Sequence, residues 1–409
     1  MRAAPGNRVS RLSVIGAVAL LAYAGTPDLS PAGAASIDSA AEDQAARDVM
    51  FVGNNWDGTV DLLDASTFAT YQRIDVVPDL EQRKAEMTPD EIAAFLAIRE
   101  TAGGGHDQLV DDIAVSPDGR TMYVSRPSLG DASAFDVATG AQLWHSEVDG
   151  FRSDHMALSR DGSELLVSAT TANVVDVLDT TDGSVVTSFP TGDFPHENQF
   201  TPDGTRILNG SIGRVIAPDD PLLDAGKGNR WLTIADATTK HVVKTIDFGV
   251  GIRPFVVMPD SNTLYVQLSF RHGFVEFDLA QERITREVDL PLSEEAQQMK
   301  REDYPLDSAH HGLALGAGST KLCDAGTVSD YAAIVSLPGL TTDAIVPVGE
   351  KPYWAAATPD GRFCFLSNSD SDDISVVSFD SAQEVARIPV GDHPQRVRAY
   401  SVPADALSS

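Results

Sequence analysis

Short runs of apolar and β-branched residues alternate with polar turn residues along most of the chain. The segment DDIAVSPDGRTMYVSRPSLGDASAFDVATGAQLWHSEV, at 111–148, contains four such runs, and 153–190 repeats their order. Runs of this length, separated by Asp, Gly and Pro, are typical of strands joined by tight hairpin turns. Each segment is therefore predicted to form a meander of four antiparallel strands.

A Pro-Asp-Gly turn, or a variant of it, marks the first hairpin of each unit. Its aspartates are Asp118, Asp161, Asp203, Asp260 and Asp360, with a degenerate copy at 317–319. With Gly318 as the degenerate anchor, successive turns are 43, 42, 57, 58 and 42 residues apart. These intervals match the roughly 40 to 50 residues of a propeller blade, and the two long ones carry insertions.

The two ends of the repeat region complement each other. Residues 49–77 supply three strands that lack an innermost partner, and 393–403 supply a lone strand. Pairing them completes one more blade and removes the open sheet edges of a linear array. We therefore predict an all-β fold at 48–402, a seven-bladed β-propeller of four-stranded antiparallel blades. In it the C-terminal strand closes the ring on the N-terminal blade; six and eight blades are the alternatives.

The first 34 residues have the pattern of an export signal. Arg2, Arg8 and Arg11 precede the apolar run 12–24, and small residues suited to cleavage follow. We expect residues 1–34 to be a signal peptide with a short exported segment, 35–47 to be flexible, and 403–409 to be a disordered tail. The apolar run is too short to span a membrane comfortably. The protein is thus expected to be secreted or periplasmic, with no membrane span after cleavage.

Charge narrows the range of partners. The 409 residues include 30 Lys and Arg against 60 Asp and Glu, a formal net charge of −30. A chain this acidic offers no basic field for a phosphate backbone, so a nucleic-acid partner is not expected. The remaining partners are a small-molecule ligand or an exported protein, and we expect a monomer.

The repeats resemble those of a known group. RTMYVSR, NTLYVQL and NVVDVLDTTDGSVVTSFPTGDFP are similar to the YVTN-type repeats of secreted seven-bladed propellers, which include surface-layer-associated and YncE-like proteins. The resemblance extends over 48–402 and implies a WD40-like fold, although the Gly-His and Trp-Asp punctuation of true WD40 blades is missing. It leaves function open, because this architecture carries binding scaffolds, lyases, lactonases and oxidoreductase subunits.

The alternation of strands places every irregular loop on one face of the ring. Three long segments lie there, at 78–110, 213–231 and 290–308. The first contains TPDEIAAFLAIRE at 88–100, a predicted helix in which Thr88 and Glu91 have the spacing of a capping box. Loops of this length in a compact domain are commonly lids or partner contacts.

Unusual side chains collect on the same face. Five of the nine histidines lie where innermost strands start, and alignment on the turns places a ring of polar residues around the channel mouth. Convergent polar groups in a concavity are typical of a ligand or active site. The candidates with catalytic roles are His155, His196, Glu197 and His311. The candidates for substrate binding are Arg253, Arg214, Tyr331, Trp354, His272 and Asp112.

Imidazoles from several blades suit a divalent transition metal such as zinc, copper or iron. The candidate metal ligands are His155, His196, His310, His311 and His393. Without a metal, the same groups could act as general acid and base. We therefore expect a small-molecule-binding protein or an enzyme of hydrolase, lyase or oxidoreductase type. The alternatives are a structural role for each single histidine, and a non-catalytic scaffold that docks a protein or cell-envelope component through this face.

Cys323 and Cys364 fall in the second strands of the sixth and seventh blades. An exported protein permits a disulfide between them. Facing sheets, however, lie about 10 Å apart, whereas a disulfide needs Cα atoms within about 7 Å. This comparison favours two buried thiols over a bridge.

Overall fold

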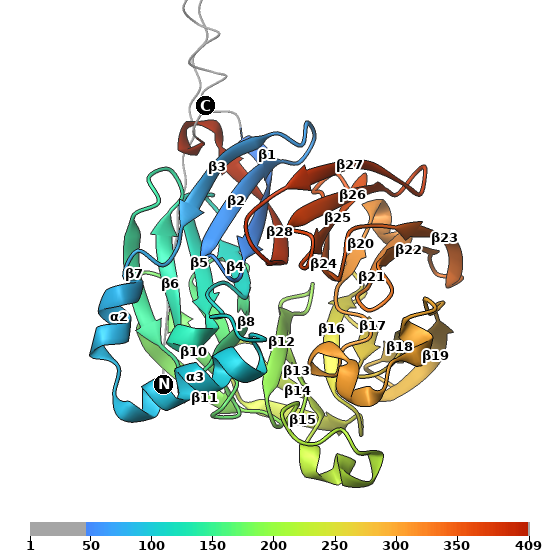
Figure 1. Cartoon of the computed structure of the whole chain (residues 1–409), viewed down its shortest axis with the longest axis horizontal. Helices are drawn as coiled ribbons and strands as arrows, with labels where there is room; N and C mark the ends of the chain where they lie inside the picture. The colour runs from blue at the N-terminus through green and yellow to red at the C-terminus, as the bar shows by residue number, and fades with distance from the viewer. Residues whose placement is uncertain (1–45, 408–409) are drawn as a thin grey trace, which may run out of the picture. The chain divides into compact units, whose positions relative to one another are not determined.

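A computed structural model describes residues 46–407, which form seven four-stranded antiparallel sheets arranged as the blades of a β-propeller (Figure 1). The predicted all-β, seven-bladed fold is confirmed. The predicted signal segment 1–34 and most of the predicted flexible segment lie outside the described residues.

Each blade is a meander that runs outward from the channel. The strands of the first three blades are β28 (Pro394–Pro403), β1 (Ala46–Asn54), β2 (Thr59–Asp64), β3 (Thr70–Asp75); β4 (Asp112–Val115), β5 (Thr121–Arg126), β6 (Asp131–Asp136), β7 (Gln142–Glu147); β8 (Ser153–Leu158), β9 (Glu164–Ala169), β10 (Val174–Asp179) and β11 (Val185–Pro190).

The remaining blades repeat this order. Their strands are β12 (Pro195–Phe200), β13 (Arg206–Ser211), β14 (Trp231–Asp236), β15 (Val242–Asp247); β16 (Ile252–Val257), β17 (Thr263–Leu268), β18 (Gly273–Asp278), β19 (Arg283–Asp289); β20 (Leu313–Leu315), β21 (Lys321–Gly326), β22 (Tyr331–Ser336), β23 (Thr341–Pro347); β24 (Pro352–Ala357), β25 (Phe363–Asn368), β26 (Asp373–Ser378) and β27 (Gln383–Pro389).

The C-terminal strand closes the ring as predicted. β28 pairs antiparallel with β1, from Ala46 opposite Pro403 to Asn54 opposite Pro394. The innermost strands then contact one another in cyclic order, β28 to β4, β8, β12, β16, β20, β24 and back to β28. Each end of the chain thereby supplies what the other end lacks.

The hydrophobic core is divided among the seven interfaces between neighbouring blades. Between the first two blades, for example, Phe51 of β1 packs in one cluster with Ile113 and Val115 of β4. The first-hairpin turns approach these interfaces closely. Gly119 has φ +71°, and a Cβ there would lie 2.6 Å from the carbonyl oxygen of Ser401, so this Pro-Asp-Gly turn requires glycine on both counts.

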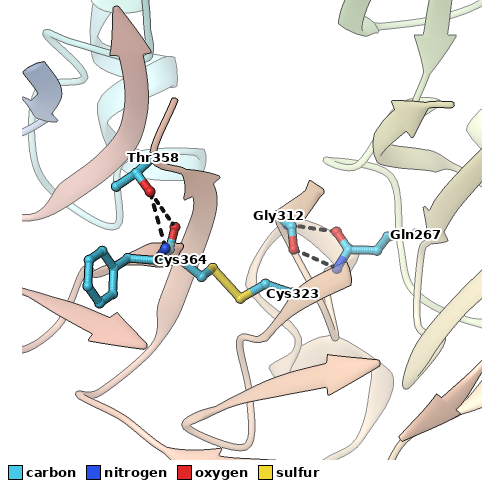
Figure 2. The surroundings of a disulfide bond; sticks show 6 residues. Gln267, Gly312, Cys323, Thr358 and Cys364 are labelled. Atoms are coloured by element: carbon cyan, nitrogen blue, oxygen red, sulfur yellow. Dashed lines mark hydrogen bonds between the residues drawn. A yellow bond between two sulfur atoms is a disulfide. The ribbon is translucent and has the colours of Figure 1, made fainter. Parts of the chain in front are cut away.

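Cys323 of β21 and Cys364 of β25 form a disulfide, so the preference for free thiols was wrong (Figure 2). Their Cα atoms are 6.5 Å apart. The expected 10 Å applies to sheets separated by large side chains, whereas this interface is rich in alanine, with Ala325, Ala332 and Ala355 buried in it. Small residues let the second strands of neighbouring blades approach to bonding distance.

The insertions contain most of the helices. α2 (Leu80–Glu86) and α3 (Pro89–Thr101) lie between the first two blades, and 3-10 helices follow at η1 (Pro127–Leu129), η2 (Pro221–Lys227), η3 (Ala296–Gln298), η4 (Arg301–Asp303), η5 (Pro305–Asp307), η6 (Ala317–Ser319) and η7 (Ala404–Ala406). The capping box of α3 is present, with Thr88 and Glu91 bonded reciprocally; α2 was not predicted.

The end of the described chain is ordered against the ring. Residues 403–407, assigned to a disordered tail, include the last residue of β28 and η7, whose Ala406 is buried beside Val402. Within residues 46–407, the helices are all too short or too polar to cross a membrane.

Loss of the disulfide should destabilise the propeller. Because the bridge joins residues 41 apart, its removal should lower the free energy of unfolding by about 4 kcal/mol through the entropy of the unfolded chain. Urea denaturation of wild type and of Cys323→Ala/Cys364→Ala measures this. A reductant should shift the wild-type midpoint and leave that of the double variant in place; an unmoved wild-type midpoint would contradict the prediction.

Candidate functional site

A cavity of about 220 Å³ lies where the innermost strands start, on the face that carries the insertions. Its polar lining comes from strand starts of several blades and comprises Gln108, Asp111, Arg152, Asp154, His155, His196, Arg253, Tyr353 and Gln395. Its apolar lining comes mainly from α3 and from the other two inserted segments, with Ala94, Ala97, Ile98, Ile212, Val215, Ile216 and Leu306. The three predicted insertions thus form walls over a polar floor.

Three imidazoles converge at this floor. His155 of β8, His196 of β12 and His311, just before β20, each offer a ligand atom within 4.8 Å of the others. All three side chains are buried. Of the five predicted metal ligands, these are the three that the structure brings together.

The hydrogen bonds at Nδ1 assign the same tautomer to all three rings. Nδ1 of His155 lies 2.7 Å from the Glu197 carboxylate, and Nδ1 of His196 lies 3.2 Å from that of Asp154. Nδ1 of His311 lies 3.0 Å from the carbonyl oxygen of Tyr353. When Glu197 is ionised, each acceptor calls for a proton on Nδ1, which leaves Nε2 with a lone pair.

Two of these lone pairs face each other. Nε2 of His196 and Nε2 of His311 are 3.1 Å apart. With both protons on Nδ1, neither nitrogen can donate to the other. The contact therefore calls for a cation bound to the two nitrogens, or for a second proton on His196, whose ring is paired with the Asp154 carboxylate.

Burial favours the neutral form of the three rings. It lowers the pKa of His155 and of His311 well below the ordinary value, reinforced by the positive charge of Arg396 for His155 and of Arg253 for His311. Burial also lowers the pKa of His196, although the Asp154 carboxylate opposes the shift. Neutral imidazole is the form that binds a metal ion.

The carboxyl groups around the rings differ in charge. Burial raises the pKa of Glu197 to about 7. Burial and the neighbouring Asp154 raise the pKa of Asp111 well above its usual range. Burial would also raise the pKa of Asp154, but the positive charge of Arg152, 2.8 Å away, and the contact with His196 hold it well below its ordinary value.

Two arginines of the closing strand, β28, contact residues next to the polar floor of the cavity. Arg396 lies 3.4 Å from the centre of the Trp354 ring, and its Nε is 3.0 Å from the carboxylate of Asp112. Arg398 also binds Asp112, at 2.9 Å, and the backbone N–H of Met156 donates to the same carboxylate. Trp354 in turn meets His155 edge to face, with ring centres 5.5 Å apart.

Of the predicted site residues, His155, His196 and Arg253 line the cavity, whereas His311, Glu197, Trp354 and Asp112 lie outside its lining, as do the residues that follow. His310 binds the Asp324 carboxylate through Nδ1 and the Tyr331 hydroxyl through Nε2. His272 binds the hydroxyl of Tyr304.

The last two predicted residues also lie outside the cavity lining. The ring of His393 stacks on Trp56. Arg214 is half-exposed and bound to Asp193.

Sequence analysis missed Arg396 and Arg398. They stand two apart on an innermost strand, so both side chains point to the same side of the sheet. In the sequence, the sign that both belong to the site was their spacing of two residues on the predicted closing strand.

No protein-family model matches the sequence, and the search of curated proteins also found no match. Among solved structures, the chain is similar to one from Kuenenia stuttgartiensis hydrazine synthase, with 18% sequence identity and a TM-score of 0.58. The match covers 80% of this chain and 94% of that chain. At this identity the likeness supports the propeller fold alone.

Asp112 should be essential for stability. Asp112→Asn leaves Arg396 and Arg398 without their buried counter-charge, which should cost about 3–5 kcal/mol of the free energy of unfolding. Urea denaturation checks this, with Asp405→Asn as the control because its pair with Arg120 is half-exposed. The control should change stability by less than about 1 kcal/mol. Equal effects of the two variants would contradict a special role for Asp112.

Proposed function

We propose that this protein is an exported, YVTN-type and YncE-like propeller that acts as a metal-dependent hydrolase on a small molecule in the cavity. The observation that supports a bound metal is the distance of 3.1 Å between the Nε2 atoms of His196 and His311, whose Nδ1 atoms already have hydrogen-bond partners. Two imidazole nitrogens on one tetrahedral zinc ion lie about 3.4 Å apart. A bound cation would remove the repulsion of these two lone pairs.

The residues around the rings fit a metal centre. His155 supplies a third imidazole, and its free nitrogen, Nε2, lies 3.7 Å from Oδ1 of Asp154. The carboxylates of Glu197 and Asp154 fix two of the rings, as outer partners of metal-bound histidines do. Neutral imidazoles suit zinc, copper or iron. Three protein ligands leave a fourth position for water or substrate.

The chain's own groups then position the reactants. A divalent ion at such a site supplies a Lewis acid and lowers the pKa of a bound water. The carboxyl groups of Asp111 and Asp154 are buried next to each other, and the raised pKa of Asp111 lets it donate a proton to the Asp154 carboxylate. Both residues line the cavity, so this pair can exchange hydrogen bonds with a water or substrate hydroxyl held there. The inserted walls limit access of bulk water.

The disulfide supports the proposed export. Disulfides persist in oxidising compartments and are rare in the reducing cytosol. The Cys323–Cys364 bridge and the signal-like pattern of residues 1–34 agree on this point. The likeness to hydrazine synthase, by contrast, supports the fold and carries no information on the reaction of this chain.

Metal content tests the proposal directly. Protein purified without chelator or affinity tag should contain about one equivalent of zinc, copper or iron by elemental analysis. His196→Ala should lose most of it because one of three ligands is gone. His241→Ala is the matched control and should keep the metal, because His241 is exposed and directly precedes the outer strand β15. A wild-type protein without metal after zinc, copper and iron are each offered would refute the centre.

A second candidate is a scaffold that docks a partner on the same face. Exposed apolar side chains support it: Ile92, Leu96, Phe151, Ile216, Leu222 and Leu223 are each at least 42% exposed. Three belong to 213–231 and two to α3, which are two of the inserted segments. Apolar side chains grouped in this way are typical of interaction surfaces.

The two candidates respond to different variants. If the face docks a cell-envelope partner, Ile216→Asp/Leu222→Asp should abolish crosslinking to that partner in the native envelope, whereas His196→Ala should preserve it. Leu143→Asp is the control, because Leu143 is 53% exposed on the outer strand β7. Crosslinking that survives the double change would exclude docking through this segment.

A further inference from the structure

Arg253 differs from the other large buried cations of the propeller. Arg126, Arg253 and Arg396 are the largest fully buried side chains. Arg126 is paired with Asp131 and Arg396 with Asp112, at 2.7 and 3.0 Å. Among residues 46–407, Arg253 makes no ion pair within 4.0 Å, although the carboxylates of Asp307, Asp154 and Asp219 act on it at longer range. A buried guanidinium without a direct ion pair can still bind an anion from outside the chain.

The guanidinium of Arg253 is held in place through two of its three nitrogens. Its Nε donates to the Ser269 hydroxyl at 3.1 Å, and its Nη2 donates to the carbonyl oxygen of Leu306. Both partners are neutral. Arg253 lines the cavity, and the remaining nitrogen, Nη1, makes no hydrogen bond with the described residues and is therefore the donor available to a ligand.

A second donor accompanies it. Tyr353 also lines the cavity. Burial raises the pKa of the Tyr353 hydroxyl to about 12, so it stays protonated and can donate at neutral pH. A fixed cationic donor and a neutral hydroxyl match the two oxygens of a carboxylate better than the larger acceptor set of a phosphate.

The rest of the cavity suits an apolar body. Ala97 and Ile98 of α3, together with Ile212, Val215 and Ile216, form its walls. The volume is about 220 Å³, whereas a dry apolar cavity of about 150 Å³ already accepts benzene. One ring with a short polar arm therefore fits, with the arm directed to the floor.

We propose that the cavity binds a small monocarboxylate with an apolar, ring-sized body, and that Arg253 and Tyr353 hold its carboxylate. The inference names the substrate class of the proposed hydrolase and rests on that function for its catalytic meaning. The binding itself depends on Arg253 and is therefore testable without the metal.

Benzoate and its neutral isostere benzamide separate the charge from the shape. Titration calorimetry on chelator-treated wild-type protein should give a benzoate affinity at least about 10-fold above that of benzamide, because a charge-assisted hydrogen bond is lost in benzamide. Arg253→Met should remove this preference. Arg387→Met, an outer-strand arginine with 41% side-chain exposure, should retain it.

Further variants keep the test decisive if Arg253→Met does not fold. Tyr353→Phe should weaken benzoate several-fold, and Arg253→Lys should retain part of the preference. Equal binding of the two probes by wild type, or no binding of either, would overturn the proposal. A preference that survives Arg253→Met would overturn it as well. Arg253-dependent binding in a protein that takes up no metal would preserve this inference and refute only the metal-dependent function.

Discussion

The pairing of β28 with β1 is the interaction on which the rest of the structure depends. It joins the two ends of the described chain over nine residue pairs of β1, from Ala46 to Asn54. Without it the first blade would lack an innermost strand and two sheet edges would lie open. The same strand also brings Arg396 and Arg398 into the channel. Ring closure and the electrostatics of the site therefore depend on one segment.

Closure explains why the site is polar and still stable. Seven strands that start around one axis bring their backbone groups and first side chains together, where water has little access. Buried polar groups must then satisfy one another. Here Asp112 pairs with two arginines, Arg396 covers Trp354, and Trp354 packs against His155. Each of these side chains holds the next one in place, so the position of the His155 imidazole is fixed by the packing beneath it.

The sequence predicted the ring because its signals are local. Turn aspartates such as Asp118 and Asp161 mark each blade, and their spacing counts the blades independently of packing. The convergence of His155 and His196 was also predictable, since they stand six and seven residues before the turn aspartates Asp161 and Asp203. His310 and His311 could not be separated in this way, because the turn at 317–319 is degenerate and β20 has only three residues. The disulfide depended on the small size of residues such as Ala325 and Ala355, which no turn pattern reveals.

The walls of the cavity are held by contacts that the ring itself does not provide. Lys227 of the second insertion binds Asp307 of the third at 2.7 Å, and Arg301 binds Asp224 at 3.0 Å. Lys227 is buried, so its ion pair is shielded from salt and fixes the two segments to each other. Leu306, beside Asp307, in turn accepts the hydrogen bond of Arg253. The ion pairs between the two insertions and the orientation of the Arg253 guanidinium thus depend on the same segment.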